Sequence, residues 1–221
     1  LCLFAVLSLT DLLLKGFSLL ARHPIQSLSG RPASALIVAL AVGIWGYGWF
    51  EARRICVERV VIATDKLPAT MDRLRIAQIS DVHLGLLVRA ERLQLIMAKV
   101  AAEGPDLLVA TGDLVDGALG PVEPLAKIFG QVSPGFGVFA VTGNHEFYAG
   151  LDYSLEVLRA LGFEVLRGEC RTVADVLNIV GVDDPTIGHL PPEKTVLTAA
   201  REGLFTLLLK HRPLVEQANP A

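Results

Sequence analysis

The sequence predicts an α/β domain that follows a strongly apolar N-terminal region. Apolar, strand-like runs alternate with helix-like stretches from Leu74 onwards, and this alternation is typical of α/β proteins. Of the 221 residues, 52% are hydrophobic, and the excess over an ordinary soluble domain lies before residue 51. We therefore expect the chain to combine membrane segments with one folded domain.

Residues 33–50 form the apolar segment best suited to a transmembrane helix. These eighteen residues carry no charge, and at about 1.5 Å per residue they extend roughly 27 Å, close to the hydrocarbon thickness of a bilayer. Trp45 and Trp49 lie near its C-terminal end, where aromatic rings favour the headgroup region, and Arg53 follows in the aqueous flank. The alternative, a buried core helix, usually carries a polar stripe. We therefore predict one transmembrane helix here.

Residues 1–32 are also apolar, but Asp11 and Lys15 interrupt them. They fit either a second transmembrane helix, truncated at its start, or an amphipathic segment at the membrane surface, and the sequence leaves both open. Because the chain begins with Leu1 and not with methionine, we expect it to be a fragment. Basic residues are equally numerous on the two sides of 33–50, so charge does not predict the membrane orientation.

The elements of the folded part follow from the apolar pattern. Residues 51–73 are expected to form a linker with one strand at 55–63, and the folded domain is expected at 74–221. Five apolar runs predict strands, at 74–80, 106–112, 137–143, 176–182 and 205–210. Four stretches between them predict helices, at 89–102, 121–130, 152–161 and 191–202. In the third helix, Asp152 is placed to cap the start and Gly162 to end it.

Polar residues of metal-binding type follow four of the predicted strands. They are Asp81, His83, Asp113, Asn144, His145 and His211. Ligand sites in open α/β sheets lie beyond the carboxyl ends of the strands, so these side chains can converge although 130 residues separate the first from the last. Gly112 and Gly143 directly precede two of them and permit tight turns.

These residues offer oxygen and nitrogen donors without thiolates, which fits Mn, Fe or Zn. The three cysteines lie far apart without a CxxC spacing, so neither a structural zinc site nor a disulfide framework is indicated. A carboxylate can bridge two cations about 3.5 to 4 Å apart, and such a pair activates a water molecule for attack on phosphorus. The pattern therefore predicts a dinuclear hydrolytic centre that needs no protein nucleophile.

Other polar residues receive a structural interpretation. Asp116, Asp183 and Asp184 are expected to be loop or turn carboxylates. His23 and His189 lie near prolines and outside the motifs, so we expect them to be ordinary surface residues.

Three motifs in this order resemble the calcineurin-like metallophosphoesterases: D-x-H at 81–83, G-D at 112–113 and G-N-H-E at 143–146. The spacings of 32 and 31 residues between their key positions, and the flanking sequences, are similar to the membrane-anchored bacterial branch of that family. The resemblance covers residues 74–221. It implies a β-sandwich flanked by helices, with one or two transmembrane helices before it.

The resemblance also implies roles for individual residues. Asp81 and His83 would bind the first of two divalent metal ions, Asp113 would bridge the two, and Asn144 and His211 would bind the second. The identity of the metals, Mn, Fe or Zn, stays open.

The resemblance makes His145 the general acid that protonates the leaving group, with Glu146 orienting it. The family also has a closing G-H-x-H motif that supplies one histidine to each metal. No such motif follows His211, and we therefore expect weak metal binding and little activity from these 221 residues.

Together these features predict an enzyme that hydrolyses a phosphomonoester, phosphodiester or pyrophosphate bond at the membrane, where lipid-linked substrates are accessible. A membrane-tethered binding module that retains the fold without catalysis is the alternative, because the closing histidines are missing. The formal net charge of −3 and the lack of a basic patch argue against a nucleic-acid partner. The resemblance implies a catalytic domain on the extracytoplasmic side of the cell membrane, whereas the substrate and the oligomeric state do not follow from the sequence.

Overall fold

The computed structural model describes residues 31–85, 88–185 and 191–212 and divides the chain into two compact units, Leu1–Cys56 and Val57–Ala221. Each unit is described by itself. The apolar segment before residue 31, with His23, and the position of His189 lie outside the described residues, so the predictions made for them stay predictions.

The described part of the first unit is one helix, α2 (Arg31–Arg53), which covers the predicted apolar helix at 33–50. Large apolar side chains along it are exposed, among them Ile44 and Phe50. At its C-terminal end the guanidinium of Arg53 stacks over the Trp49 ring, 3.4 Å from the ring centroid. Of the helices that the structure describes, none is long and apolar enough to cross a membrane. The structure thus confirms a helix at this place and gives no support to the membrane crossing predicted for it.

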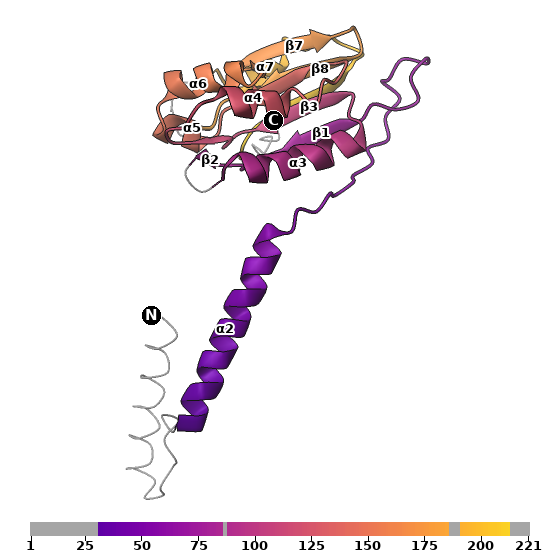
Figure 1. Cartoon of the computed structure of the whole chain (residues 1–221). Helices are drawn as coiled ribbons and strands as arrows, with labels where there is room; N and C mark the ends of the chain where they lie inside the picture. The colour runs from indigo at the N-terminus through magenta and orange to yellow at the C-terminus, as the bar shows by residue number, and fades with distance from the viewer. Residues whose placement is uncertain (1–30, 86–87, 186–190, 213–221) are drawn as a thin grey trace, which may run out of the picture. The chain divides into compact units, whose positions relative to one another are not determined.

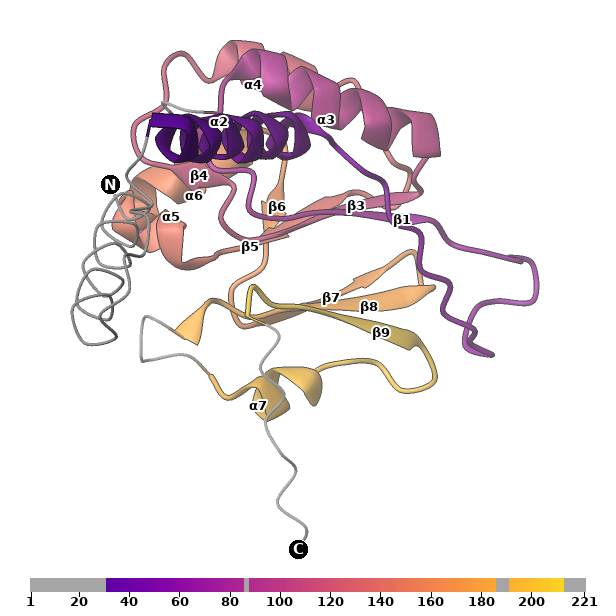
Figure 2. The same ribbon diagram turned by 90° about the horizontal axis from the view of Figure 1, so that it is seen from below.

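The second unit (Figure 1) is built around a parallel four-stranded sheet in the order β1-β3-β5-β6, whose strands are all labelled in Figure 2. The strands are β1 (Ile76–Ile79), β3 (Leu107–Thr111), β5 (Val138–Val141) and β6 (Glu164–Val165). Each pairing is parallel, so the carboxyl ends of β1, β3 and β5 meet at one edge of the sheet. The predicted site residues other than His211 follow these three ends.

Helices cover one face of this sheet: α3 (Ala90–Glu103), α4 (Glu123–Phe129) and α6 (Leu151–Ala160). Their buried apolar side chains and those of the sheet form one core cluster, to which Met97 and Leu158 belong. Helix α3 ends at Gly104, whose backbone is left-handed, as is common at helix C-termini.

A second sheet of three strands covers the opposite face (Figure 2). It contains β7 (Glu169–Val173) and β8 (Leu177–Gly181), which are antiparallel, and β9 (Phe205–Leu209), which is parallel to β8. The short helix α7 (Glu193–Leu197) contacts β7. Side chains of both sheets form a second core cluster. The domain is therefore a sandwich of two sheets with helices on its outer face, which agrees with the predicted α/β class.

Strand β3 shows how the sequence produces these layers. All five of its residues are buried, because successive side chains point to opposite faces of the sheet and both faces are covered. Leu108 and Ala110 belong to the core under the helices, whereas Leu107 and Val109 belong to the core between the sheets.

The five strands predicted within the domain are confirmed, and the four predicted helices have counterparts within a few residues. The strand predicted at 55–63 is wrong, because these residues form neither helix nor strand. Val60, Val61 and Ile62 are exposed, and without a neighbouring strand their β-branched pattern has nothing to pair with. The chain instead adds a small sheet of two parallel strands, β2 (Leu84–Gly85) and β4 (Val115–Asp116).

Candidate metal centre

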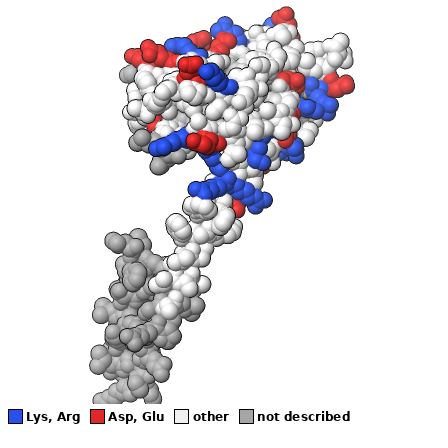
Figure 3. Space-filling model, viewed as in Figure 1, with Lys and Arg blue, Asp and Glu red and all other residues white. Residues whose placement is uncertain are grey.

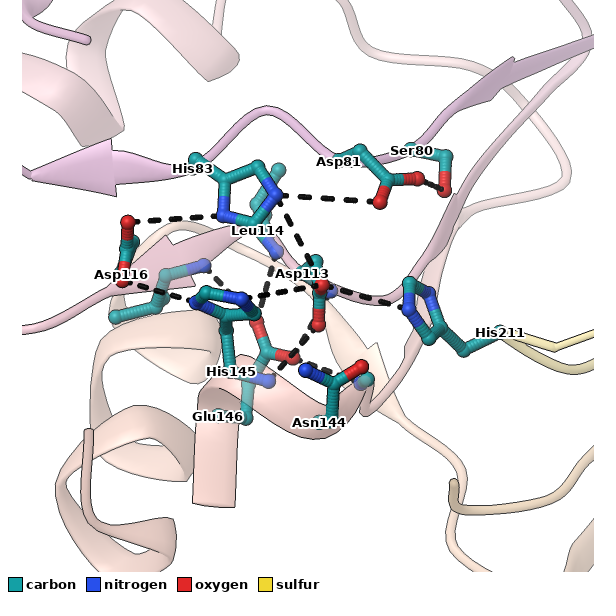
Figure 4. Close-up of polar contacts among 12 residues, drawn as sticks. Ser80, Asp81, His83, Asp113, Leu114, Asp116, Asn144, His145, Glu146 and His211 are labelled. Atoms are coloured by element: carbon teal, nitrogen blue, oxygen red, sulfur yellow. Dashed lines mark hydrogen bonds and ion pairs between the residues drawn. The ribbon is translucent and has the colours of Figure 1, made fainter. Parts of the chain in front are cut away.

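The candidate site lies at the edge of the sheet where β1, β3 and β5 end (Figure 4). Asp81 and His83 come from the segment between β1 and β2, and Asp113 comes from the turn after β3. His145 lies in α5 (Asn144–Tyr148), which follows β5, and His211 follows β9 of the other sheet. The structure therefore brings these predicted residues to one place from four separate strands.

Asp113 is the centre of this cluster and is 3% exposed. Its Oδ2 atom lies 3.4 Å from Nε2 of His211, 3.8 Å from Nε2 of His83 and 4.0 Å from Nε2 of His145. Nε2 of His83 is also 3.9 Å from Oδ1 of Asp81. One buried carboxylate thus faces three imidazole nitrogens at distances that leave space for a cation between them.

Two groups of side chains could each hold a metal ion, and both include Asp113. His83, Asp113 and His145 make up the first group, and Asp81, Asp113 and His211 make up the second. Within each group the ligand atoms lie within 4.8 Å of one another. The donors are carboxylate oxygens and imidazole nitrogens, which suit Mn, Fe or Zn. The residues present therefore fit divalent cations, with Asp113 placed to contact two.

Three of these residues have backbone conformations that are unusual for side chains other than glycine. The φ angles are 52° at Asp81, 51° at His83 and 53° at Asp113, all in the left-handed region. Each costs about 1–2 kcal/mol, and such residues cluster at functional sites. Backbone hydrogen bonds hold the two segments together, from Asp81 N–H to the Gly112 carbonyl (3.2 Å) and from His83 N–H to the Asp113 carbonyl (2.9 Å).

Gly112 and Gly143 let the turns after β3 and β5 approach closely. Gly112 has a φ of 93°, and a Cβ atom there would lie 2.7 Å from the Gly143 nitrogen and 2.8 Å from Nδ1 of His211. At Gly143 the backbone is extended, but a Cβ atom would lie 2.1 Å from Oδ1 of Asp113. Only glycine fits at either position without moving the site.

Glu146 connects these two turns through hydrogen bonds to their backbone amides. Its side chain is fully buried, and the carboxylate accepts four backbone N–H hydrogen bonds, from Asp113 (2.9 Å), Leu114 (2.7 Å), Val115 (2.9 Å) and Gly143 (2.7 Å). The family resemblance implies that Glu146 orients His145. Its described hydrogen bonds go to backbone amides, so its effect on the site is to hold the turn that carries Asp113 against the start of α5.

Asp116, interpreted from the sequence as a loop carboxylate, lies within hydrogen-bonding distance of the His145 ring. Its Oδ1 lies 3.0 Å from Nδ1 of His145, and its Oδ2 lies 3.7 Å from Nδ1 of His83. This hydrogen bond raises the pKa of His145, the negative charges of Asp113 and Glu146 act in the same direction, and burial acts against them. The parallel pairing of β4 with β2 brings Asp116 beside Gly85, and that pairing was not visible in the sequence.

His211 and Asn144 lie on the other side of Asp113 (Figure 4). Nδ1 of His211 lies 3.0 Å from the Thr111 carbonyl oxygen. Because a carbonyl oxygen can only accept, Nδ1 carries the proton and Nε2 keeps the lone pair that faces Asp113. Oδ1 of Asn144 lies 3.5 Å from Nη2 of Arg212.

Asp183 and Asp184, which the sequence predicts to be loop or turn carboxylates, are both buried. Asp183 accepts hydrogen bonds from the Thr142 hydroxyl (2.7 Å) and from Nε of Arg167 (2.8 Å). Asp184 pairs with Arg212, whose Nε lies 2.9 Å from Oδ2. Each buried carboxylate thus has one arginine partner, which is how proteins accommodate buried charge.

Comparison with known proteins agrees with this geometry. Residues 74–215 match the family model described as calcineurin-like phosphoesterase. An uncharacterized metallophosphoesterase of Aquifex aeolicus is 39% identical over 80% of this chain and 70% of its own length. Transmembrane proteins with a metallophosphoesterase domain from Danio rerio and Bos taurus are 32% and 30% identical over 81% and 88% of this chain. The matched regions cover 44% and 48% of those two relatives, so the chain spans about half their length.

Proposed function

The chain belongs to the calcineurin-like phosphoesterase family, and we propose that it hydrolyses a phosphomonoester, phosphodiester or pyrophosphate bond with a water molecule activated by two divalent cations. The observation that carries this proposal is the pair of candidate ligand groups that share the buried carboxylate of Asp113. A shared carboxylate is the usual means of holding two cations close together in phosphoesterases.

The proposed ligands follow the family motifs. Asp81 and His83 would bind one cation, Asn144 and His211 would bind the other, and Asp113 would bridge them. The distances from Asp113 to His83 (3.8 Å) and to His211 (3.4 Å) support Asp113 as the shared ligand. The geometric groups divide the other residues differently from the motifs, with His83 beside His145 and Asp81 beside His211. Bound cations would supply the Lewis acidity that generates hydroxide near neutral pH and neutralises phosphate oxygens.

His145 is the proposed general acid for the leaving group. Its Nδ1 is held by Asp116 at 3.0 Å, so the ring is fixed and Nε2 is directed to the side of Asp113. The hydrogen bond to Asp116 raises the pKa of His145, which favours a protonated ring at neutral pH. A proton on Nε2 would then be available to the departing oxygen.

We also propose that α2 holds the domain at a membrane. Two relatives are named transmembrane proteins with a metallophosphoesterase domain, and α2 exposes apolar side chains such as Ile44, 70% exposed. The full chain is expected to float with phosphatidylcholine vesicles in a density gradient. Ile44→Glu should abolish flotation and Glu51→Gln, on the same helix, should retain it; equal recovery of both variants with the vesicles would contradict the proposal.

Hydrolysis and metal content test the proposed activity together. The chain is saturated with Mn, Fe or Zn, and an aryl phosphate, a diaryl phosphate and a nucleotide pyrophosphate are offered separately. Asp113→Asn should lower both the metal content and the rate by at least about tenfold. Asp175→Asn is the matched control, because Asp175 is also an aspartate with a left-handed backbone (φ 56°) but is exposed and pairs with Arg201. Hydrolysis that is equal in the two variants would refute the proposed centre.

A further inference from the structure

Asp184 is a fully buried carboxylate beside the candidate metal centre, and the proposed ligand set does not use it. A buried ionised carboxylate is costly unless a cation pairs with it. Its Oδ2 lies 2.9 Å from Nε of Arg212. This ion pair restrains the position of the guanidinium group.

The contacts of Arg212 place its guanidinium at the rim of the centre. Arg212 directly follows His211, whose ring faces Asp113, and its Nη2 lies 3.5 Å from Oδ1 of Asn144. The side chain of Arg212 is 44% exposed, so a solute can reach it from solvent. The group is therefore anchored on one side and accessible on another, next to two proposed ligands of the second cation.

The guanidinium of Arg212 is suited to the recognition of a phosphate group. With two divalent cations bound, the negative charge of Asp81, Asp113 and Asp116 would be offset, and a phosphate group would still need donors for the oxygens that the cations do not contact. A guanidinium offers paired N–H donors that match two oxygens of a phosphate, and it keeps its charge at any pH at which the protein is folded.

We propose that Arg212, held by Asp184, binds the phosphate group that is to be hydrolysed. This inference rests on the proposed function and adds to it a phosphate-binding residue outside the metal ligands. The alternative is that Arg212 only positions the amide of Asn144, and the experiment separates the two.

Binding of inorganic phosphate to the Mn-saturated full chain is the test, measured by titration calorimetry with metal content determined on the same samples. Arg212→Ala should weaken phosphate binding by about tenfold to a hundredfold, as expected for loss of a charge-assisted pair, with unchanged metal content. Arg212→Lys keeps the charge without the planar donor pair and should fall between wild type and Arg212→Ala. Asp184→Asn should also weaken binding, because the guanidinium loses its anchor.

Arg167→Lys is the matched control, because Arg167 also pairs with a buried carboxylate, that of Asp183. This variant should bind phosphate with the affinity of the wild type. Unchanged phosphate affinity in Arg212→Ala, absence of phosphate binding by wild type, or a loss of metal equal to that of Asn144→Ala would each overturn the proposal. If hydrolysis continues with unaltered KM in Arg212→Ala, this inference fails and the proposed function stands. If phosphate binding depends on Arg212 but no ester is hydrolysed, this inference stands and the proposed function fails.

Discussion

Replacement of Glu146 by glutamine is expected to destabilise the domain severely although the two side chains have the same shape. Each carboxylate oxygen accepts two backbone N–H groups: Oε1 those of Leu114 and Val115, and Oε2 those of Asp113 and Gly143. Glutamine has one acceptor oxygen and one NH₂ donor, so in either orientation two buried N–H groups face a donor.

Each buried N–H that loses its partner costs about 1–3 kcal/mol, so Glu146→Gln should lower the free energy of unfolding by roughly 2–6 kcal/mol. The lost charge adds to this, because hydrogen bonds to a carboxylate are stronger than those to an amide. Urea unfolding followed by circular dichroism, with the slope and midpoint fitted together, gives the free energy.

Glu169→Gln, an exposed position on β7, is the control and should change the free energy of unfolding by less than about 0.5 kcal/mol. If Glu146→Gln is as stable as this control, the four backbone contacts do not hold the turn as we argue.

Three further predictions concern the site. Gly143→Ala should lower metal affinity, since its Cβ would lie 2.1 Å from Oδ1 of Asp113; Gly120→Ala, with open space around it, should not, and calorimetric metal titration compares them. Asp116→Asn should lower the pKa of His145 toward its ordinary value, because the carboxylate that raises it is lost; imidazole NMR titration of metal-free protein that shows the same pKa in both proteins would contradict this. Chelation should abolish phosphate ester hydrolysis, and added Mn, Fe or Zn should restore it; hydrolysis that persists in metal-free protein would exclude the proposed chemistry.

The apolar pattern predicted the strands and helices of the domain because periodicity reports burial, whereas the sandwich of two sheets was expected only from the family resemblance. The apolar run that ends in Leu107, Leu108, Val109 and Ala110 predicted a strand, and the structure confirms it as β3, in which Thr111 is buried as well. The same logic failed at 55–63, where a β-branched run predicted a strand but periodicity carries no information about a partner. The short strands β2 and β4 were missed for the opposite reason, since two residues are too few to show any period.

The candidate site, too, was predicted from the sequence only in part. Parallel strands end at one edge, so the convergence of Asp81, Asp113 and His145 followed from the strand prediction. The contacts of Glu146 and Asp116 did not follow, because they join positions 29 to 33 residues apart through backbone amides and a two-stranded sheet. Such contacts depend on the exact path of a turn, which residue type and spacing do not specify.

The carboxylates in and around the site differ in the partners that offset their charge, and this difference explains why the cluster suits bound cations. Glu146 is surrounded by four backbone N–H groups, and Asp183 and Asp184 each pair with an arginine. Among the contacts that the structure describes, Asp81 and Asp113 face only imidazoles, a hydroxyl and one backbone N–H, in a segment with strained backbone. Carboxylates held together in this way repel each other unless positive charge lies between them. The fold therefore provides partners for the acids that support the site and leaves those that face its centre beside imidazoles, an arrangement that suits the proposed pair of divalent cations.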